Sequence, residues 1–198
     1  MRSTAQGGPQ QYEYVQIGTQ KWMTRNLDVV RYRNGDSIPN IIDNTDWSNL
    51  NTGAYSNYDN SLLNGAFYGK LYNWYTLDDP RGLAPVGWHI PTDDEWTTLA
   101  NYLGGDLVGG GKMKVEGTTI WAAPNTGADN TSGFTALPAG NRAPNGPYNY
   151  IGNYTYWWSS IQQTITTARI RIVNFASAGV PSATDAKNSG LSVRCIKD

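Results

Sequence analysis

Charged residues, cysteine and histidine are all scarce in this chain. Only 16 % of its 198 residues are charged, and it has one cysteine, Cys195, and one histidine, His89. A single cysteine excludes an intramolecular disulfide and a cysteine-based zinc site, and a single histidine excludes a metal site built on a histidine pair. The formal net charge of −1 does not indicate a polyanionic partner, so we expect no nucleic-acid binding.

Long hydrophobic runs are missing as well. No stretch approaches the roughly 20 consecutive apolar residues that a membrane-spanning helix needs, so we expect no membrane insertion. The opening segment "MRSTAQGGPQQ" lacks the apolar core of a signal peptide. We expect residues 1–11 to be a flexible lead-in or a linker, and residues 12–198 to form a single domain.

Glycine, proline and aromatic residues are abundant instead. The chain contains 22 Gly, 10 Pro, 13 Tyr and 8 Trp. Disordered chains are poor in aromatic residues, so this composition predicts an ordered domain with many loops. It is typical of proteins that work outside the cell or at its surface.

The clearest helix signal lies in "GWHIPTDDEWTTLANYLGG", residues 87–105. Thr92 is predicted to be the N-cap, and Glu95 three residues later completes a capping box. Glycines at 104–105 end the helix. The apolar residues that recur at helical spacing, and that we expect to be buried, are Trp96, Leu99, Ala100 and Leu103.

Three consecutive acids, Asp93, Asp94 and Glu95, open this helix. Negative charge in a first turn interacts favourably with the helix dipole, which favours a structural role. A pair of catalytic carboxylates, as in a glycosidase, is the alternative. Neighbouring positions in one turn point in different directions, which argues against that alternative.

Short strands and loops are predicted elsewhere. Residues 12–32 fit two strands joined by a turn at 18–19, and "GKLYNWYTL" (residues 69–77) fits either a short helix or a strand. Residues 33–60 are rich in Asn, Asp and Gly and predict a long ordered loop, pinned by Trp47, Tyr55 and Tyr58.

The C-terminal segments alternate as strands do. In "ARIRIVNF" the side chains of Ile170, Ile172 and Asn174 are predicted to share one face, and Arg169, Arg171, Val173 and Phe175 the other. In "GLSVRCIKD" we expect Leu191, Val193 and Cys195 to point inward. Cys195 is then a small buried hydrophobe and not a nucleophile.

Three acids of the Asn/Asp-rich loop, Asp43, Asp46 and Asp59, could bind Ca²⁺ through oxygen ligands. The spacing of an EF-hand is absent, and solvated turns explain these residues equally simply. We therefore predict no metal site and no cofactor, with calcium as the alternative.

Several motifs together resemble one family. They include "IGTQKWMTRNLDVVRYRNGDSIPN", "LAPVGWHIPTDDEWTTLANYLGG", "NTGADNTSGFTALPAGNR", "GNYTYWWSS" and "SGLSVRCIKD", in this order along nearly the whole chain. The combination resembles the Fibrobacter succinogenes major paralogous domain family of Bacteroidetes proteins. The resemblance implies an α+β, C-type-lectin-like fold with one or two helices, small antiparallel sheets and long ordered loops.

That fold group also includes the formylglycine-generating enzymes, whose chemistry needs two active-site cysteines. The present chain has one cysteine, so the resemblance implies a domain that is not an enzyme. The calcium motifs of sugar-binding animal lectins are not found in the sequence either.

The same fold carries the variable proteins of diversity-generating retroelements, in which template adenines are mutated. The chain departs from the family's usual motifs at four positions, Asn141, Ile161, Gln162 and Leu191, between motif residues such as Trp157 and Trp158 that stay. All except Gln162 are residue types reachable from mutated Asn codons. The pattern resembles a diversified protein.

Residues 141–191 are the candidate variable and ligand-binding region. From residue 141 to 190 there is one acidic residue, Asp185, whereas the preceding 140 residues have fourteen. Aromatic area from tyrosines, Tyr154 among them, with adaptable Asn, Ser and Thr is typical of binding surfaces. Arg169 and Arg171 would limit aggregation of this strand, and Arg is a frequent interface residue.

The residues that we predict to contact a ligand are Asn141, Tyr148, Tyr150, Asn153, Thr155, Tyr156, Ile161, Gln163, Thr164, Thr166, Arg169, Ile170, Ile172, Asn174, Ser182, Thr184, Asn188 and Leu191. For the Thr and Ile residues at 155, 161, 164, 166, 170 and 172, a structural role in a strand is as compatible with the sequence as contact with a ligand. Trp157 and Trp158 are predicted to be core.

These observations predict a non-enzymatic ligand- or receptor-binding domain, displayed on a phage tail fibre, a pilus or a bacterial surface. Its partner would be a cell-surface protein or a glycan, and its location extracellular, on the cell surface or on a virion. A homo-oligomer would suit display on a fibre. The alternative is an invariant bacterial surface lipoprotein domain that binds glycan through stacked aromatic residues.

Overall fold

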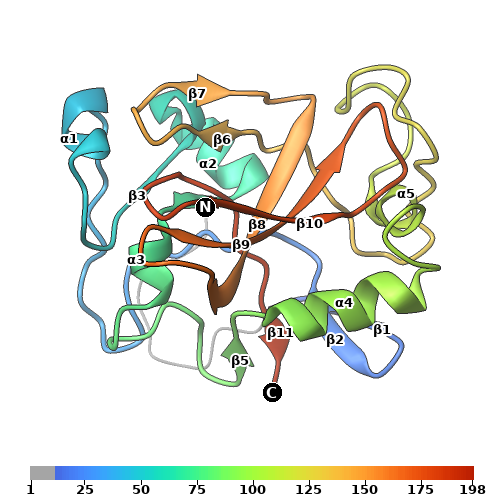
Figure 1. Cartoon of the computed structure of the whole chain (residues 1–198), viewed down its shortest axis with the longest axis horizontal. Coiled ribbons are helices and arrows are strands. Elements are labelled where there is room, and N and C mark those ends of the chain that lie inside the picture. The colour runs from blue at the N-terminus through green and yellow to red at the C-terminus, as the bar shows by residue number, and fades with distance from the viewer. Residues whose placement is uncertain (1–11) are drawn as a thin grey trace.

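The computed structural model describes residues 12–198, so the segment predicted to be a lead-in lies outside the described residues. Within that range the named strands form four small antiparallel sheets (Figure 1). The four-stranded sheet, in the order β1-β2-β11-β5, consists of β1 (Tyr14–Ile17), β2 (Gln20–Met23), β11 (Ile196–Lys197) and β5 (Trp88–His89). The three-stranded sheet, in the order β10-β9-β8, consists of β8 (Tyr154–Gln162), β9 (Thr167–Asn174) and β10 (Ser182–Ala186). The two remaining pairs are β3 (Tyr55–Ser56) with β4 (Leu71–Tyr72), and β6 (Asn141–Arg142) with β7 (Tyr148–Asn149).

Short helices connect these sheets. They are α1 (Asn44–Ser48), the 3₁₀ helix η1 (Tyr58–Asn60), α2 (Leu62–Tyr68), α3 (Trp74–Leu77), α4 (Asp93–Tyr102) and α5 (Gly109–Met113). The predicted α+β class is confirmed, but the number of helices is larger than the one or two predicted. Asp43, Ser61 and Asn73 each cap a helix of seven residues or fewer with their side chains. Such one- and two-turn helices are too short to produce a helical period in the sequence.

Helix α4 has the predicted start, stripe and end. The Glu95 backbone N–H donates to Thr92 Oγ1 (3.2 Å), and the Thr92 backbone N–H donates to Glu95 Oε2 (2.8 Å), which is a complete capping box. Gly104 and Gly105 follow with φ of 105° and 98°, where a side chain would be strained. All four stripe residues are buried, with exposed fractions of 4 % or less: Trp96, Leu99, Ala100 and Leu103.

Two hydrophobic clusters lie on opposite faces of β8. Trp158 packs into one cluster with Ile170, Tyr72 and Trp74, while its neighbour Trp157 packs into the other with Trp96. Consecutive strand residues point to opposite faces, so two adjacent tryptophans can anchor two cores. Both are fully buried, as predicted, and the three-stranded sheet is fixed between the clusters.

The segment that fitted either a helix or a strand and the segment predicted to be a long loop both contain short helices and strands. Residues 69–77 contain both elements considered, the strand β4 followed by the helix α3. The loop at 33–60 contains α1, β3 and η1, and its three predicted anchors are buried: Trp47, Tyr55 and Tyr58. The C-terminal segment is buried on both sides from 191 to 196. Leu191, Val193 and Cys195 pack into one hydrophobic cluster, which confirms the predicted inward face, while Arg194 and Ile196 lie against the other cluster.

Three buried cations hold loops together through backbone carbonyls. The Lys114 ammonium donates to the carbonyls of Thr126 (2.9 Å), Asn174 (3.0 Å) and Ser177 (2.9 Å). Burial lowers the pKa of Lys114 to about 8, so the ammonium is still mainly protonated at neutral pH. Arg142 and Arg194 are also buried and also donate to carbonyls of distant loops. None of the ion pairs among residues 12–198 involves these three cations.

Candidate ligand-binding surface

The three-stranded sheet presents one face that is partly open. The register places Tyr154 opposite Asn174, Tyr156 opposite Ile172, and Trp158 opposite Ile170. This face is buried at its Trp158 end, and it opens toward Tyr154, which is half-buried. The predicted sharing of one face by residues 170, 172 and 174 is therefore confirmed.

Three tyrosines form a row along this face. The ring centroids of Tyr150 and Tyr154 are 5.2 Å apart, and those of Tyr154 and Tyr156 are 5.8 Å apart with an interplanar angle of 7°. We call Tyr150, Tyr154 and Tyr156 the tyrosine row. Phe175 meets the middle ring edge-on at 6.4 Å. Aromatic contacts of this kind contribute about 0.5–1.5 kcal/mol beyond the area they bury, so the rings hold one another in place.

The two ends of the tyrosine row differ in environment. Tyr150 is 52 % exposed and adopts a left-handed backbone with φ of 66°, which is rare for a bulky residue. Tyr156 is more buried, and its burial raises its phenolic pKa above the ordinary value, with smaller contributions from Tyr154, Tyr150 and Asp185. The row therefore runs from a solvent-exposed ring to one that is fixed in the core.

The hairpin that joins β8 and β9 ends in an exposed tip, residues 160–166, which we call the hairpin tip. Ile165 is 85 % exposed and Ile161 is 41 % exposed. Thr164 Oγ1 lies 2.7 Å from Thr167 Oγ1 and accepts from backbone N–H groups of the turn, which orders it locally. The end of the hairpin lies beside α3 (Figure 1), where Lys187 contacts Gln162 and lies 4.3 Å from the Trp74 ring.

The structure places the eighteen predicted contact residues in three environments. The exposed ones are Tyr150, Ile161, Gln163, Thr164, Thr166 and Thr184. The partly buried ones are Tyr148, Asn153, Tyr156, Arg169, Ile172, Asn174, Ser182 and Asn188. The buried ones are Asn141, Thr155, Ile170 and Leu191.

The four buried residues correct the prediction. Thr155, Ile170 and Leu191 are at most 2 % exposed, so they have no surface with which to touch a ligand. Asn141 is 9 % exposed, and its buried side-chain oxygen has no hydrogen-bond partner among residues 12–198. Strand alternation cannot reveal which face of a strand a core covers, and here one core covers Ile170 and Leu191.

The remaining predicted residues do not all share the tyrosine face. Arg169 pairs with Thr184, and Ser182 with Arg171, on the opposite face of the sheet. Arg171, which was expected with Arg169 to limit aggregation of this strand, is 1 % exposed. Asn188 donates its amide to the carbonyls of Ser48 (3.4 Å) and Pro144 (3.2 Å), which fits a structural role.

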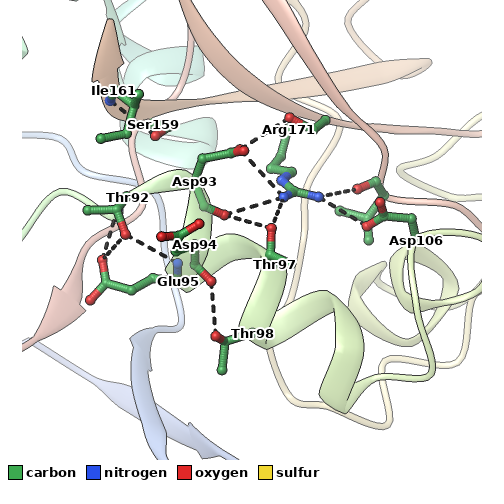
Figure 2. Close-up of polar contacts among 12 residues, drawn as sticks. Thr92, Asp93, Asp94, Glu95, Thr97, Thr98, Asp106, Ser159, Ile161 and Arg171 are labelled. Carbon is green, nitrogen blue, oxygen red and sulfur yellow. Dashed lines mark hydrogen bonds and ion pairs between the residues drawn. The ribbon is translucent and has the colours of Figure 1, made fainter.

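Two of the three acids at the start of α4, Asp93 and Glu95, are occupied by structural side-chain contacts, while Asp94 accepts from Thr98 Oγ1 through its backbone carbonyl (Figure 2). Both oxygens of Glu95 are used, one by Thr92 and the other by His89 Nε2 at 2.8 Å. Asp93 Oδ1 accepts from Ser182 Oγ (3.1 Å) and lies 3.4 Å from Arg171 Nη2. The dashed contacts in Figure 2 connect Asp93 to Arg171 of the sheet, whereas those of Thr92 with Glu95 and of Asp94 with Thr98 lie within the helix start.

A second concave feature lies between the start of α1, η1 and β7. Residues 42–44, 59–60 and 147–148 line a shallow hollow of about 450 Å³, which we call the loop hollow. Asp43 and Asp59 line it but Asp46 does not. Among residues 12–198, no group of three or more His, Cys, Asp or Glu side chains could hold a metal ion. The three acids considered for Ca²⁺ are thus not brought together as ligands.

Some parts of this surface were missed in the sequence. Tyr154 was expected to add aromatic area but was not placed among the contacts, and it is the centre of the tyrosine row. Its spacing of two from Tyr156 was the available signal. Nothing in the sequence indicated that Asp43 and Asp59 lie beside Tyr148.

Fold and surface together define an α+β domain of small antiparallel sheets with a partly open aromatic face. The model of the Fibrobacter succinogenes major domain matches residues 15–197, so the chain belongs to this family, as its motifs predicted. No curated protein and no solved structure matches the chain. The helices of the described part of the chain are all too short or too polar to cross a membrane.

Proposed function

We propose that this chain is a non-enzymatic binding domain whose contact surface is the tyrosine row together with the hairpin tip. The observation that carries the proposal is the row itself, with rings 5.2 and 5.8 Å apart on a sheet fixed between two cores. A rigid aromatic surface loses little conformational entropy when it binds. The hairpin tip, at the opposite end of β8 from Tyr154, adds exposed Thr and Gln side chains for adaptable hydrogen bonds.

The setting that we propose is display on a phage tail fibre, a pilus or a bacterial surface, with a cell-surface protein or glycan as partner. A C-type-lectin-like fold would be consistent with short strands, long loops and five small helices. A homo-oligomer would suit a fibre. Two aromatic features support an invariant glycan-binding domain as the second candidate: the stacked pair Tyr154–Tyr156 and the exposed ring of Tyr150.

We also propose that residues 141–191 are diversified, but at fewer positions than the sequence suggested. Of the four departures from the family motifs, Ile161 and Gln162 are exposed, whereas Asn141 and Leu191 are buried. Variation that alters binding without unfolding the domain must fall on exposed positions. We therefore expect it at the hairpin tip and not at positions 141 and 191.

The binding proposal is tested with fluorescently labelled protein on a panel of bacterial cells and on protein and glycan arrays. Tyr154→Ser should weaken binding to any positive target at least tenfold at a temperature where circular dichroism shows the variant to be fully folded. The matched control is Tyr102→Ser, which removes an exposed tyrosine (65 % exposed) on α4. Equal binding by Tyr154→Ser and wild type would refute the proposed surface.

The diversification proposal is tested by sequencing the locus from several isolates. Replacements should concentrate in the codons of the hairpin tip, while those of Trp157 and Trp158 stay constant. Sparse and synonymous differences would contradict diversification and would leave a fixed binding surface.

A further inference from the structure

The loop hollow is built from segments that are far apart in the sequence. Its walls come from the chain entering α1, from η1 and from β7. In Figure 1, α1 and β7 lie at the top left of the molecule, away from α4 and the C-terminus. The hollow of about 450 Å³ is within the usual size range of small-ligand sites.

Specific contacts hold the walls in place. The Tyr148 hydroxyl donates to Asn60 Oδ1 (2.8 Å), and the Tyr148 ring lies 4.9 Å from the buried Arg142 guanidinium. The same guanidinium donates to the carbonyl of Asp43 and to Asn44 Oδ1, at 3.0 and 3.2 Å. One buried cation therefore fixes two of the three walls relative to each other.

The close approach of these walls depends on a glycine. A Cβ atom at Gly146 would lie 2.4 Å from Asn44 Cβ, and Gly146 has φ of 110°. Any larger residue would push β7 away from the start of α1. The third wall has two consecutive non-glycine residues in left-handed conformation, Asp59 (φ 51°) and Asn60 (φ 55°).

Two carboxylates supply free acceptor oxygens in the hollow. Asp43 uses Oδ1 to cap α1, and its other oxygen has no hydrogen bond to residues 12–198. The exposed carboxylate of Asp59 likewise has no partner in that range. Among the described residues, no Lys or Arg lines the hollow, whereas Ile42 does and is 61 % exposed.

We propose that the loop hollow binds one ring of a neutral glycan, at a site separate from the tyrosine row. Sugar hydroxyls would donate to the free carboxylate oxygens of Asp43 and Asp59, which are strong acceptors. The exposed apolar surface of Ile42 suits the C–H face of the ring. Sialic and uronic acids are disfavoured because two carboxylates would face a third without a cation between them.

The test is a series of NMR titrations of ¹⁵N-labelled protein. The neutral probes are the methyl glycosides of glucose, galactose, mannose and N-acetylglucosamine, and the anionic probes are N-acetylneuraminic acid and glucuronic acid. At least one neutral probe should shift the amides of Asn44, Asn60 and Tyr148 in a saturable way. Anionic probes should bind at least tenfold more weakly, and EDTA should change nothing.

The variants separate this site from the proposed main surface. Asp59→Gly keeps the left-handed backbone available and removes the carboxylate, so it should weaken binding at least tenfold. The control Asp46→Ala removes an exposed acid of α1 that does not line the hollow and should bind within twofold of wild type. Asp59→Asn removes the charge but keeps a side chain of the same shape that also tolerates left-handed backbone. Weaker binding by this variant would therefore come from loss of the carboxylate and not from loss of the fold.

Each outcome decides between the two proposals. If Tyr154→Ser leaves the glycoside titration unchanged and Asp59→Gly abolishes it, the loop hollow is an independent site. The proposal for the loop hollow would be overturned if no neutral probe shifted any amide, if Asp59→Gly bound as tightly as wild type, or if EDTA abolished binding. None of these results tests the tyrosine row, for which the cell and array binding assay is the test.

Discussion

Replacing Lys114 by methionine should destabilise the domain, because this ammonium connects three loops. It donates to the carbonyls of Thr126, Asn174 and Ser177 at 2.9–3.0 Å, and the side chain is fully buried. Methionine keeps the apolar stem but has no donor. Each carbonyl left without its donor costs about 1–3 kcal/mol.

The variant also recovers some free energy, because a buried ammonium no longer has to be desolvated, a cost of several kcal/mol in the wild type. We therefore expect a net loss of about 2–4 kcal/mol in the free energy of unfolding. For a chain of this length, 1 kcal/mol corresponds to roughly 2–4 °C. The melting temperature should then fall by roughly 4–16 °C.

Urea unfolding followed by tryptophan fluorescence measures this free energy directly, and calorimetry measures the melting temperature. The matched control is Lys21→Met, at an exposed lysine, which should change stability by less than about 0.5 kcal/mol. Equal stability of Lys114→Met and Lys21→Met would refute the reasoning, since the three carbonyls would then be satisfied without the ammonium.

Three further predictions concern other buried or capped groups. Burial alone would lower the pKa of His89, but hydrogen bonds to two carboxylates raise it above 6.5. The protonated imidazole therefore stabilises the folded state fully below pH 6.5, and this stabilisation declines as the pH rises through the folded-state pKa. His89→Gln should flatten the decline of the melting temperature with rising pH, and a variant with the same pH profile as wild type would contradict this prediction. Burial raises the pKa of Cys195 to about 12, so Ellman's reagent should react with it in guanidinium but not in the native protein at mildly alkaline pH. Thr92→Ala should cost about 1 kcal/mol in urea unfolding through loss of the N-cap, and exposed Thr98→Ala clearly less.

Local features of this fold could be predicted from the sequence, and the helix α4 shows why. Its N-cap, capping box and buried stripe all lie within fifteen residues, so short-range chemistry determines them. The short helices α1 and α2 were missed because one or two turns show no period. The two adjacent tryptophans, Trp157 and Trp158, were correctly assigned to the core, although not to two different clusters.

The candidate site was predictable only in part, because exposure is a property of the whole fold. Ile170 and Ile172 lie on the same face of β9, yet one is 2 % exposed and the other only partly buried. The difference arises from the residues that pack above each isoleucine, and strand alternation carries no information about these packing partners. The loop hollow was invisible for the same reason, since residues 43, 59 and 148 meet only through tertiary contacts.

The buried cations explain how a weakly charged chain keeps its long loops ordered. A sheet or helix satisfies its own carbonyls, but a loop that enters the interior must find other donors. Lys114, Arg142 and Arg194 supply them, each reaching loops far away in the sequence without an acidic partner among residues 12–198. A carboxylate would have competed for the same N–H groups, which here donate to backbone carbonyls and to the side-chain oxygens of Asn26 and Asn44. Two of these cations also position the surfaces proposed to bind ligands. Lys114 holds the carbonyl of Asn174, which pairs with Tyr154 at the open end of the tyrosine face, and Arg142 holds two walls of the loop hollow. Substituting either cation should therefore weaken binding at its own site more than at the other.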